Sequence, residues 1–312
     1  MAENLVEAPV KVCLVISSFQ HDQAVERILQ RIFTADKSPF FKIIVVDSLG
    51  TGRMPKLLRE RGWHDVAYHC FAHNLGSAGN LAERLRLAAA SEAAFAYAVN
   101  HDAALDLSVV EMLVAQANSI ERLGALFPMR RIIRQGNKLD TTGASILPLP
   151  FFGTKPTQAL PALLPVKWSS SNGALYSLAP IREGLTPWSD FWLGWEDLAY
   201  GWLLDAHGYR QYIVSGARVD DDYEYRDFRL GPLKLKLTDK PSWYTYYQIR
   251  NLLLATQRTR RPLAIRSVVA SRIVLELALT VLFREEKKQR LHNLFCGLAD
   301  GLAGRSGKWM LP

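Results

Sequence analysis

Short apolar runs alternate with segments of helical periodicity through the first part of the chain. The runs are rich in Val, Ile and Ala and lack strict apolar–polar alternation, which is typical of strands buried on both faces. They predict strands at 10–18, 41–47, 66–71, 94–100 and 125–129. The segments of helical periodicity predict helices at 23–33, 54–62, 77–90 and 107–124. This alternation with short links predicts an α/β fold, Rossmann-like, with a mostly parallel sheet and helices on both faces.

The pattern becomes less regular after about residue 130. Residues 131–165 are rich in Pro, Gly and Thr, which indicates hairpins and a long loop. A strand interrupted by polar residues follows at 166–178, then a helix at 195–210 and a strand at 211–219. From Trp243 onward helices dominate. We therefore divide the chain into a catalytic domain at 1–225, with halves at about 10–128 and 129–225, and a basic helical region at 226–312.

Composition narrows the cellular setting. The chain has 312 residues, 49% of them apolar, which is enough for a sizeable core. Its three cysteines are far apart and form no CxxC pair, so neither a disulfide framework nor a structural zinc site is expected. The opening "MAENLVEAPV" lacks the basic start and apolar core of a signal peptide. We expect a cytoplasmic protein.

The positive charge is concentrated in the C-terminal region. The net charge is +8, and residues 226–312 hold 17 Lys and Arg against 6 Asp and Glu. Such a balance favours an anionic partner: membrane lipid, nucleic acid or a substrate that carries a pyrophosphate. No nucleic-acid-binding motif accompanies the charge, so we do not expect a nucleic-acid partner.

The longest apolar stretch, 263–283, has two readings. It carries Arg266, Arg272 and Glu276, so it is a poor transmembrane span. Its hydrophobicity suits a helix at the membrane interface, with basic residues near anionic headgroups. It equally suits a helical hairpin that packs on the catalytic domain or joins a homo-oligomer.

Polar residues gather at the ends of the predicted strands. In parallel α/β sheets ligands bind beyond the carboxyl ends of the strands. The polar residues at those ends are Ser17, Ser18, Asp47, His73, Asn74, Asn100 and Asp102. The dinucleotide and P-loop glycine patterns are absent, as is the GxSxG nucleophile elbow, so these residues do not belong to those site classes.

An acidic pair, Glu196-Asp197, opens the predicted helix at 195–210. Acids in the first turn of a helix complement its dipole, which is the simpler explanation for the pair. The surrounding "FWLGWEDLAYGW" is rich in aromatic residues, which pack well against sugar rings and bases. Residue type alone leaves both explanations open.

The order of these segments resembles the family 2 glycosyltransferases, which have the GT-A fold. The resemblance covers about residues 10–258, with a weaker echo near the C-terminus. The segments that carry it are "VCLVISSFQHDQAVERIL", "FKIIVVDS", "AHNLGSAGNLAERL", "YAVNHDAAL" and "WEDLAYGWLLDAHGYR". "SWYTYYQIRNLLLATQR" and "GLADGLAGRSGK" are similar to the bacterial branch that contains rhamnosyl- and galactofuranosyltransferases.

The resemblance implies roles for individual residues. Asp102 would bind Mg²⁺ or Mn²⁺, whose remaining ligands are typically water and substrate phosphates. Asp197 would be the general base that takes the proton of the acceptor hydroxyl, assisted by Glu196. Trp195 would stack on the acceptor, with core packing as an equal alternative. The donor nucleotide-sugar would contact Ser17, Ser18, Phe19, Asp47, Asn74, Gly79, Asn100, Asn172, Gly173 and Arg250. For Arg250, a contact with the pyrophosphate and bracing of its helix are equal alternatives.

Two departures from the family pattern affect these roles. The second strand continues as "VDSLGTG", so the second acidic residue that the family usually carries there is missing and Gly52 stands near its place. The late strand is followed by "DDD" rather than the His of many relatives. Either Asp220 or Asp221 takes over as an oxygen ligand, with Asp221 preferred, or the acidic run is a solvated turn.

The function that these residues imply is an inverting transfer of a sugar from a dTDP- or UDP-linked donor. Rhamnose or galactofuranose is the favoured sugar, and the acceptor would be a bacterial surface glycan, free or lipid-linked. The enzyme would work in the cytoplasm, at the inner face of the inner membrane. The alternative is a non-catalytic relative of the same fold that binds nucleotide or glycan.

Overall fold

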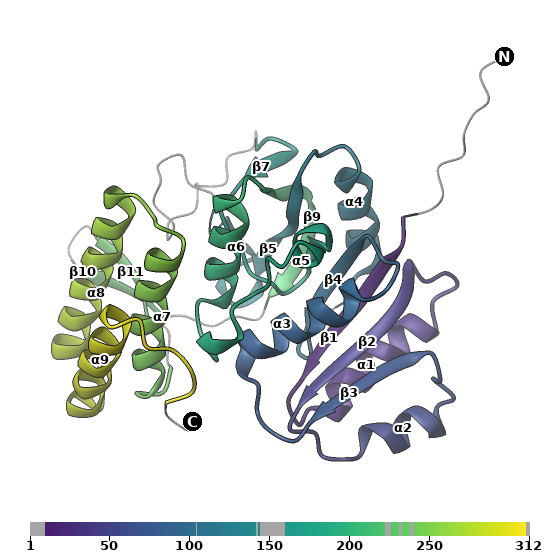
Figure 1. Ribbon diagram of the computed structural model, residues 1–312, viewed down its shortest axis with the longest axis horizontal. Helices are drawn as coiled ribbons and strands as arrows, with labels where there is room; N and C mark the ends of the chain where they lie inside the picture. The colour runs from purple at the N-terminus through teal and green to yellow at the C-terminus, as the bar shows by residue number, and fades with distance from the viewer. Residues whose placement is uncertain are drawn as a thin grey trace.

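The computed structural model describes residues 10–103, 105–141, 143, 160–221, 226–230, 233–237 and 240–309 (Figure 1). For residues 135, 221, 226–230 and 233–237 the description covers the backbone alone. The strands are β1 Val12–Ser18, β2 Phe40–Ser48, β3 Val66–Phe71, β4 Phe95–Asn100, β5 Leu123–Ile132, β6 Lys138–Asp140, β7 Leu163–Pro165, β8 Ala174–Ser177, β9 Arg210–Asp221, β10 Arg226–Leu230 and β11 Leu233–Leu237. The α-helices are α1 Asp22–Phe33, α2 Met54–Glu60, α3 Gly76–Ala89, α4 Leu107–Ala117, α5 Ala179–Arg182, α6 Glu196–Ala206, α7 Tyr244–Arg258, α8 Leu263–Phe283 and α9 Lys287–Leu302. Two 3₁₀ turns are η1 Ile133–Gln135 and η2 Ser189–Phe191.

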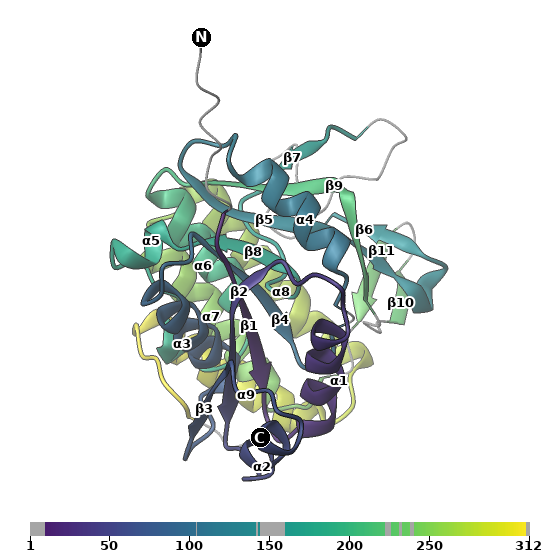
Figure 2. The same cartoon turned by 90° about the vertical axis from the view of Figure 1, so that its right-hand side faces the viewer.

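One mixed sheet organises the described residues. Its strand order is β3-β2-β1-β4-β8-β5-β9-β7, with β6 paired to β5 (Figure 2). β1 pairs in parallel with both β2 and β4, and β5 pairs in parallel with β9. β8 runs antiparallel between β4 and β5. The chain adds β2 and β3 on one side of β1 and then crosses to the other side for β4, so the ends of β1 and β4 form a topological switch point.

The two faces of the sheet belong to two apolar cores. Along β1, Leu14 and Ile16 join the core under α1 and α4, whereas Cys13 and Val15 join the core under α3. All four side chains are fully buried. The continuous apolar run in this strand is therefore required by burial on both faces, as the sequence predicted.

A third apolar layer joins the C-terminal helices to the sheet. Residues of α6 such as Leu198 and Trp202 pack in one cluster with Leu252 of α7 and Val269 of α8. Figure 1 shows α7, α8 and α9 on the far side of α6 from β2 and β3. Helix α6, which begins with the acidic pair, therefore lies between the sheet and the helical layer.

Helix α8 packs one face into this layer and leaves several apolar side chains exposed on the other. Ile265, Val269 and Ile273 are buried, while Leu263, Val274 and Leu282 are exposed. Among the described residues no helix is both long and apolar enough to cross a membrane.

The structure confirms the predicted α/β fold with C-terminal helices, and differs in some bounds. The helix predicted at 107–124 ends at Ala117, and β5 begins at Leu123. The region from 226 begins with the antiparallel hairpin β10–β11 before its helices start. Within the region 131–165 predicted to contain hairpins and a long loop, residues 142 and 144–159 lie outside the described residues.

Candidate functional site

The switch point brings two predicted donor-binding residues together. Ser17 lies one residue before the end of β1, and its hydroxyl donates a hydrogen bond of 3.1 Å to Oδ1 of Asn100, which ends β4. The backbone N–H of Asn100 in turn donates to Oδ1 of Asn172, at 3.0 Å. Gly173 follows with φ +82°, and its N–H donates to the carbonyl oxygen of Ala98 at 2.8 Å. The segment around Asn172 is thereby fixed against the end of β4.

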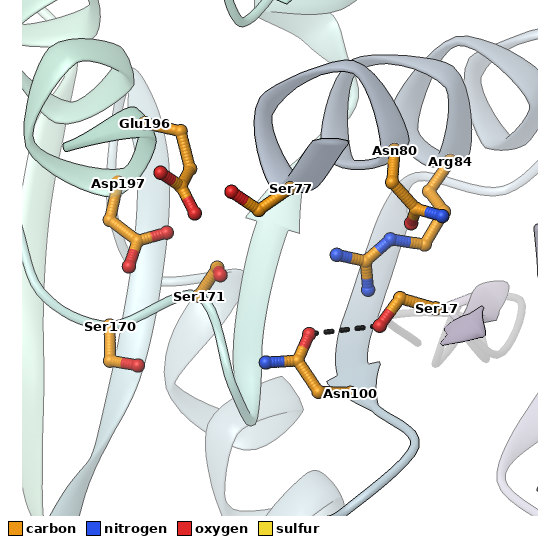
Figure 3. Close-up of a pocket in the computed structure, with 9 residues that line it drawn as sticks. All are labelled: Ser17, Ser77, Asn80, Arg84, Asn100, Ser170, Ser171, Glu196 and Asp197. Atoms are coloured by element: carbon orange, nitrogen blue, oxygen red, sulfur yellow. Dashed lines mark hydrogen bonds between the residues drawn. The ribbon is translucent and has the colours of Figure 1, made fainter. Parts of the chain in front are cut away.

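The acidic pair faces this switch point across a small polar cavity. Glu196 and Asp197 form the first turn of α6, after Gly194 and Trp195 turn the chain with φ values of +85° and +62°. The cavity has a volume of about 100 Å³. Figure 3 shows its lining residues: Ser17, Ser77, Asn80, Arg84, Asn100, Ser170, Ser171, Glu196 and Asp197. Four of the residues predicted for the site therefore line one cavity: Ser17, Asn100, Glu196 and Asp197.

Burial raises the pKa of Asp197 toward neutrality. Burial and the neighbouring charge of Glu196 raise the pKa of Asp197 to about 7, although hydrogen bonds from Ser171 and the charge of Arg130 lower it. Oδ1 of Asp197 and Oε2 of Glu196 are buried and have no hydrogen-bond partner among the described residues. A carboxylate with a pKa near neutrality and a free oxygen can accept a proton at neutral pH.

The glycine-rich segment at 74–80 builds the opposite wall of the cavity. Oδ1 of Asn74 accepts a hydrogen bond of 2.8 Å from the N–H of Gly76, which begins α3. A Cβ added at Gly79 would lie 3.2 Å from Cβ of Leu75 and 4.0 Å from Cβ of Ser189 in η2. Asn80 donates to the carbonyl oxygen of Val46 at 3.0 Å. In this structure Asn74 and Gly79 therefore position the helix, and the segment presents Ser77 and Asn80 to the cavity.

Buried polar side chains of α7 hold the loop in front of the acidic pair. Nδ2 of Asn251 donates to the carbonyl oxygens of Phe191, Leu193 and Gly194, at 3.0, 2.8 and 2.8 Å. Arg250 is fully buried, and its Nη2 donates to the carbonyl oxygen of Phe191 at 2.9 Å. These contacts correspond to the bracing alternative for Arg250.

Trp195 packs into the core beside the acidic pair. Its indole N–H donates to the carbonyl oxygen of Gln248 at 3.0 Å. Its ring lies edge-on to Trp168, with centroids 6.0 Å apart. These contacts correspond to the core-packing alternative for Trp195.

Asp47 lies at the end of β2, next to the switch point. It is fully buried, and its Oδ2 accepts a hydrogen bond of 2.9 Å from the hydroxyl of Tyr68. Burial and this contact raise the pKa of Tyr68. Oδ1 of Asp47 has no partner among the described residues, and nor does the buried hydroxyl of Ser18. Phe19, which follows Ser18, is 38% exposed.

The predicted metal ligand Asp102 is exposed in the turn after β4. No group of three His, Cys, Asp or Glu side chains in the described part of the chain could hold an ion unaided. A single exposed carboxylate fits an ion that takes its other ligands from water and a diphosphate. The ring of His101 stacks on that of His21, with centroids 4.1 Å apart, and is already engaged there.

The two candidate ligands in the acidic run "DDD", Asp220 and Asp221, differ in what the structure describes. Asp220 forms a two-pronged ion pair with Arg131, with contacts of 2.6 and 2.8 Å. The hydrogen bonds from Arg131 lower the pKa of Asp220. The side chain of Asp221, the preferred second metal ligand, lies outside the described residues, so that role stays a prediction.

Five cavity residues were not among the predicted site residues: Ser77, Asn80, Arg84, Ser170 and Ser171. Asn80 belongs to the glycine-rich motif and could have been selected from it. Arg84 lies one helical turn beyond Asn80 on the same face of α3, so helical spacing was the available signal. The serines carry no signal of their own, because they reach the cavity through the course of the loop at 169–172.

Comparison with solved structures gives the fold. No family model matches the sequence, and no curated protein matches it. S. aureus TarS, residues 1–349, aligns over 95% of this chain and 83% of its own, with a TM-score of 0.60 and 11% identity. The same TarS fragment has been solved with UDP and with UDP-GlcNAc. The mannosyltransferase PcManGT from Pyrobaculum calidifontis, solved with GDP-Man and Mn²⁺, aligns over 95% of this chain and 89% of its own, with a TM-score of 0.54 and 12% identity.

The chain has the GT-A fold. In this GT-A domain the cavity lies where β1 and β4 end and α6 begins. That is the edge at which an open α/β sheet binds its ligands.

Proposed function

We propose that this protein is a glycosyltransferase that moves a sugar from a nucleotide-diphosphate donor to a hydroxyl of a glycan acceptor. The observation that carries the proposal is the position of Asp197. It faces the ends of β1 and β4 across one polar cavity of a GT-A fold, and its pKa of about 7 suits a general base. The nucleotide-sugars held by TarS and PcManGT support the class of donor.

The proposed reaction is a single displacement at the anomeric carbon. The acceptor oxygen forms a bond to C1 while the bond from C1 to the diphosphate oxygen breaks, and the diphosphate leaves with the electron pair. The carboxylate of Asp197 takes the acceptor proton. Because the nucleophile attacks opposite the leaving group, the configuration at C1 inverts. Glu196 supports this by keeping the pKa of Asp197 high through its adjacent charge.

Donor binding would use the residues around the switch point. Ser17 and Asn100 line the cavity, and the contact of Asp47 with the nucleoside stays a prediction from the sequence resemblance, because Asp47 is fully buried beside the cavity. Asp102 would hold Mg²⁺ or Mn²⁺, which supplies positive charge to offset the charge on the departing diphosphate. Rhamnose or galactofuranose as the sugar, a bacterial surface glycan as the acceptor, and a position at the inner membrane surface stay predictions from the sequence resemblance.

The decisive variant is Asp197→Asn. It preserves the shape of the side chain but cannot take a proton at neutral pH, so we expect transfer to fall by roughly 10²- to 10⁴-fold. Nucleotide binding and the folded circular dichroism spectrum should persist. Donors linked to UDP, dTDP and GDP would be screened by calorimetry with and without Mn²⁺, and turnover measured as release of the nucleoside diphosphate.

The matched control is Asp205→Asn, which changes an acid on the same helix. Asp205 pairs with Lys167 and Arg261 outside the cavity, so this variant should lose stability while keeping transfer. Full activity of Asp197→Asn would remove the proposed mechanism. Tight nucleotide binding by the wild type, without turnover of any donor, would favour the non-catalytic alternative.

A further inference from the structure

Arg84 is a buried cation beneath the switch point. It extends from α3, and only 2% of its surface is exposed. Its Nη1 donates to the carbonyl oxygens of Val15 in β1 and Val99 in β4, at 3.3 and 2.9 Å. One guanidinium therefore ties together the two strands whose ends form the site.

Arg84 also faces the cavity. Figure 3 shows its guanidinium on the wall across from Glu196 and Asp197. Five buried atoms of cavity residues have no hydrogen-bond partner among the described residues: Ser77 Oγ, Asn80 Oδ1, Arg84 Nε, Glu196 Oε2 and Asp197 Oδ1. Buried polar atoms are almost always paired, so these atoms point to polar guests. A cavity of about 100 Å³ holds several waters or the hydroxyl-bearing part of a sugar.

The charges around Asp197 come from four elements. Glu196 is on the same helix, Arg84 on α3, Arg130 on β5 and Tyr176 on β8. Arg130 also lies 3.8 Å from Asp140, so its charge is shared. Burial lowers the pKa of Arg84 to about 10, and the neighbouring Tyr176, Asp197 and Glu196 act to raise it, so Arg84 is charged at neutral pH.

We propose that Arg84 is a positioning residue of this site: its guanidinium is the internal counter-ion that keeps Asp197 in its ionised, proton-accepting form while it braces the ends of β1 and β4. The inference rests on the proposed function, which gives the reason why Asp197 has to be ionised. The titration of Asp197 can be measured without that function. Without Arg84, Arg130 would be the remaining cation near Asp197, and the adjacent charge of Glu196 would raise the pKa of Asp197 further.

The test compares Arg84→Gln with Arg84→Lys. The titration midpoint of the Asp197 carboxyl would be read by infrared spectroscopy, as the band that Asp197→Asn removes from each background. We expect Arg84→Gln to move this midpoint up by about one pH unit or more, because an opposite charge nearby has been lost. Arg84→Lys keeps the charge and should move it by only a few tenths of a unit. The acidic limb of kcat/KM should follow the midpoint, with a loss of roughly tenfold at pH 6 in Arg84→Gln.

Arg290→Gln is the matched control for bracing. Arg290 is also buried, and it donates to the carbonyl oxygens of Glu285 and Lys240 at 3.1 and 2.7 Å, away from the cavity. This variant should lower the melting temperature and leave the midpoint of Asp197 unchanged. A midpoint that also stays unchanged in folded Arg84→Gln would overturn the proposal and leave Arg84 a structural brace.

Arg84→Lys decides the matter if Arg84→Gln does not fold. A buried amine loses its charge at lower pH than a guanidinium. The KM for the donor should then rise between about pH 8 and 9.5 in Arg84→Lys and not in the wild type, because two carboxylates would face an anionic donor uncompensated. A flat KM over this range would overturn the proposal. Because the infrared midpoint needs no substrate, a shift without any transfer would contradict the proposed function alone.

Discussion

At the scale of single residues, the proposed reaction depends mainly on the carboxyl group of Asp197. Its first oxygen is buried without a partner among the described residues, and burial together with Glu196 raises its pKa to about 7. A carboxyl that only complemented a helix dipole would be exposed and ionised well below neutrality. The negative charge of Asp197 in the first turn of α6 therefore lowers the stability of the folded protein.

The pH dependence follows from the raised pKa. Only ionised Asp197 can accept a proton, so kcat/KM should fall tenfold per pH unit below about pH 7. For stability the sign is opposite, because the folded state binds this proton more tightly than the unfolded state. Ionised Asp197 therefore destabilises the fold above neutral pH, and this cost falls as the pH drops from about 7 toward the unfolded pKa of about 4.

Asp197→Asn consequently should melt higher than the wild type at pH 8, by about 2–4 °C for each kcal/mol gained. The difference should shrink by pH 5. Calorimetric scans at both pH values measure it. A variant that melts lower than the wild type at pH 8 would show that the ionised carboxylate is well compensated.

At the scale of elements, the site depends on a close approach between α3 and the loop before α6. Gly76 has φ +68°, and a Cβ there would lie 2.0 Å from the carbonyl oxygen of Trp192. The N–H of Ala78 donates to that same carbonyl at 3.1 Å. A residue with a Cβ at position 76 would clash with this carbonyl oxygen. A helix shifted to avoid the clash would lose the hydrogen bond from Ala78.

Gly76→Ala should therefore destabilise the protein far more than a matched glycine substitution. Gly62 has the same φ of +68°, but a Cβ there meets nothing within 4 Å. Gly62→Ala should cost about 1 kcal/mol for the left-handed conformation alone. For Gly76→Ala we expect about 2 kcal/mol more, by analogy with forced contacts in packed interiors. Urea denaturation of both variants measures the difference, and equal losses would show that the loop moves away without cost.

Over the whole molecule, residues 303–309 return to the loop that precedes α6. The N–H of Gly307 donates to the carbonyl oxygen of Asp190 at 2.6 Å, and the carbonyl of Gly307 accepts from Nη1 of Arg250. The ring of Trp309 stacks on Tyr246, with centroids 4.2 Å apart. This segment, which we call the tail, thus connects the end of the helical layer to the front of the site.

Removal of residues 304–312 should loosen the loop and reduce transfer more than donor binding. We expect kcat to fall roughly tenfold, because a displacement of the base by 1 Å is costly to a reacting geometry. Removal of residues 310–312 alone is the control and should leave transfer intact. Equal kcat in both truncated proteins would show that the loop holds its position without the tail.

The sequence predicted the fold because its signals are local. The central residues of the runs at 10–18 and 41–47 are apolar on both faces, and the structure buries 12–16 and 43–46 on both faces. The cavity was only partly predicted. Ser17, Asn100, Glu196 and Asp197 were identified by strand ends and resemblance, whereas Arg84 reads in the sequence as a charged helix residue. Its burial depends on carbonyls of two strands that are adjacent only in the folded sheet.

The tail also sets an order of events during synthesis. A ribosome adds residues 306–309 on the order of ten seconds after the loop at 188–194, at ordinary rates of elongation. By then β1 to β4 have long been available to fold around a nucleotide, whereas the acidic pair still lacks its final support. On the proposed function, a nascent chain of this protein should bind the nucleotide-sugar donor before it can transfer the sugar.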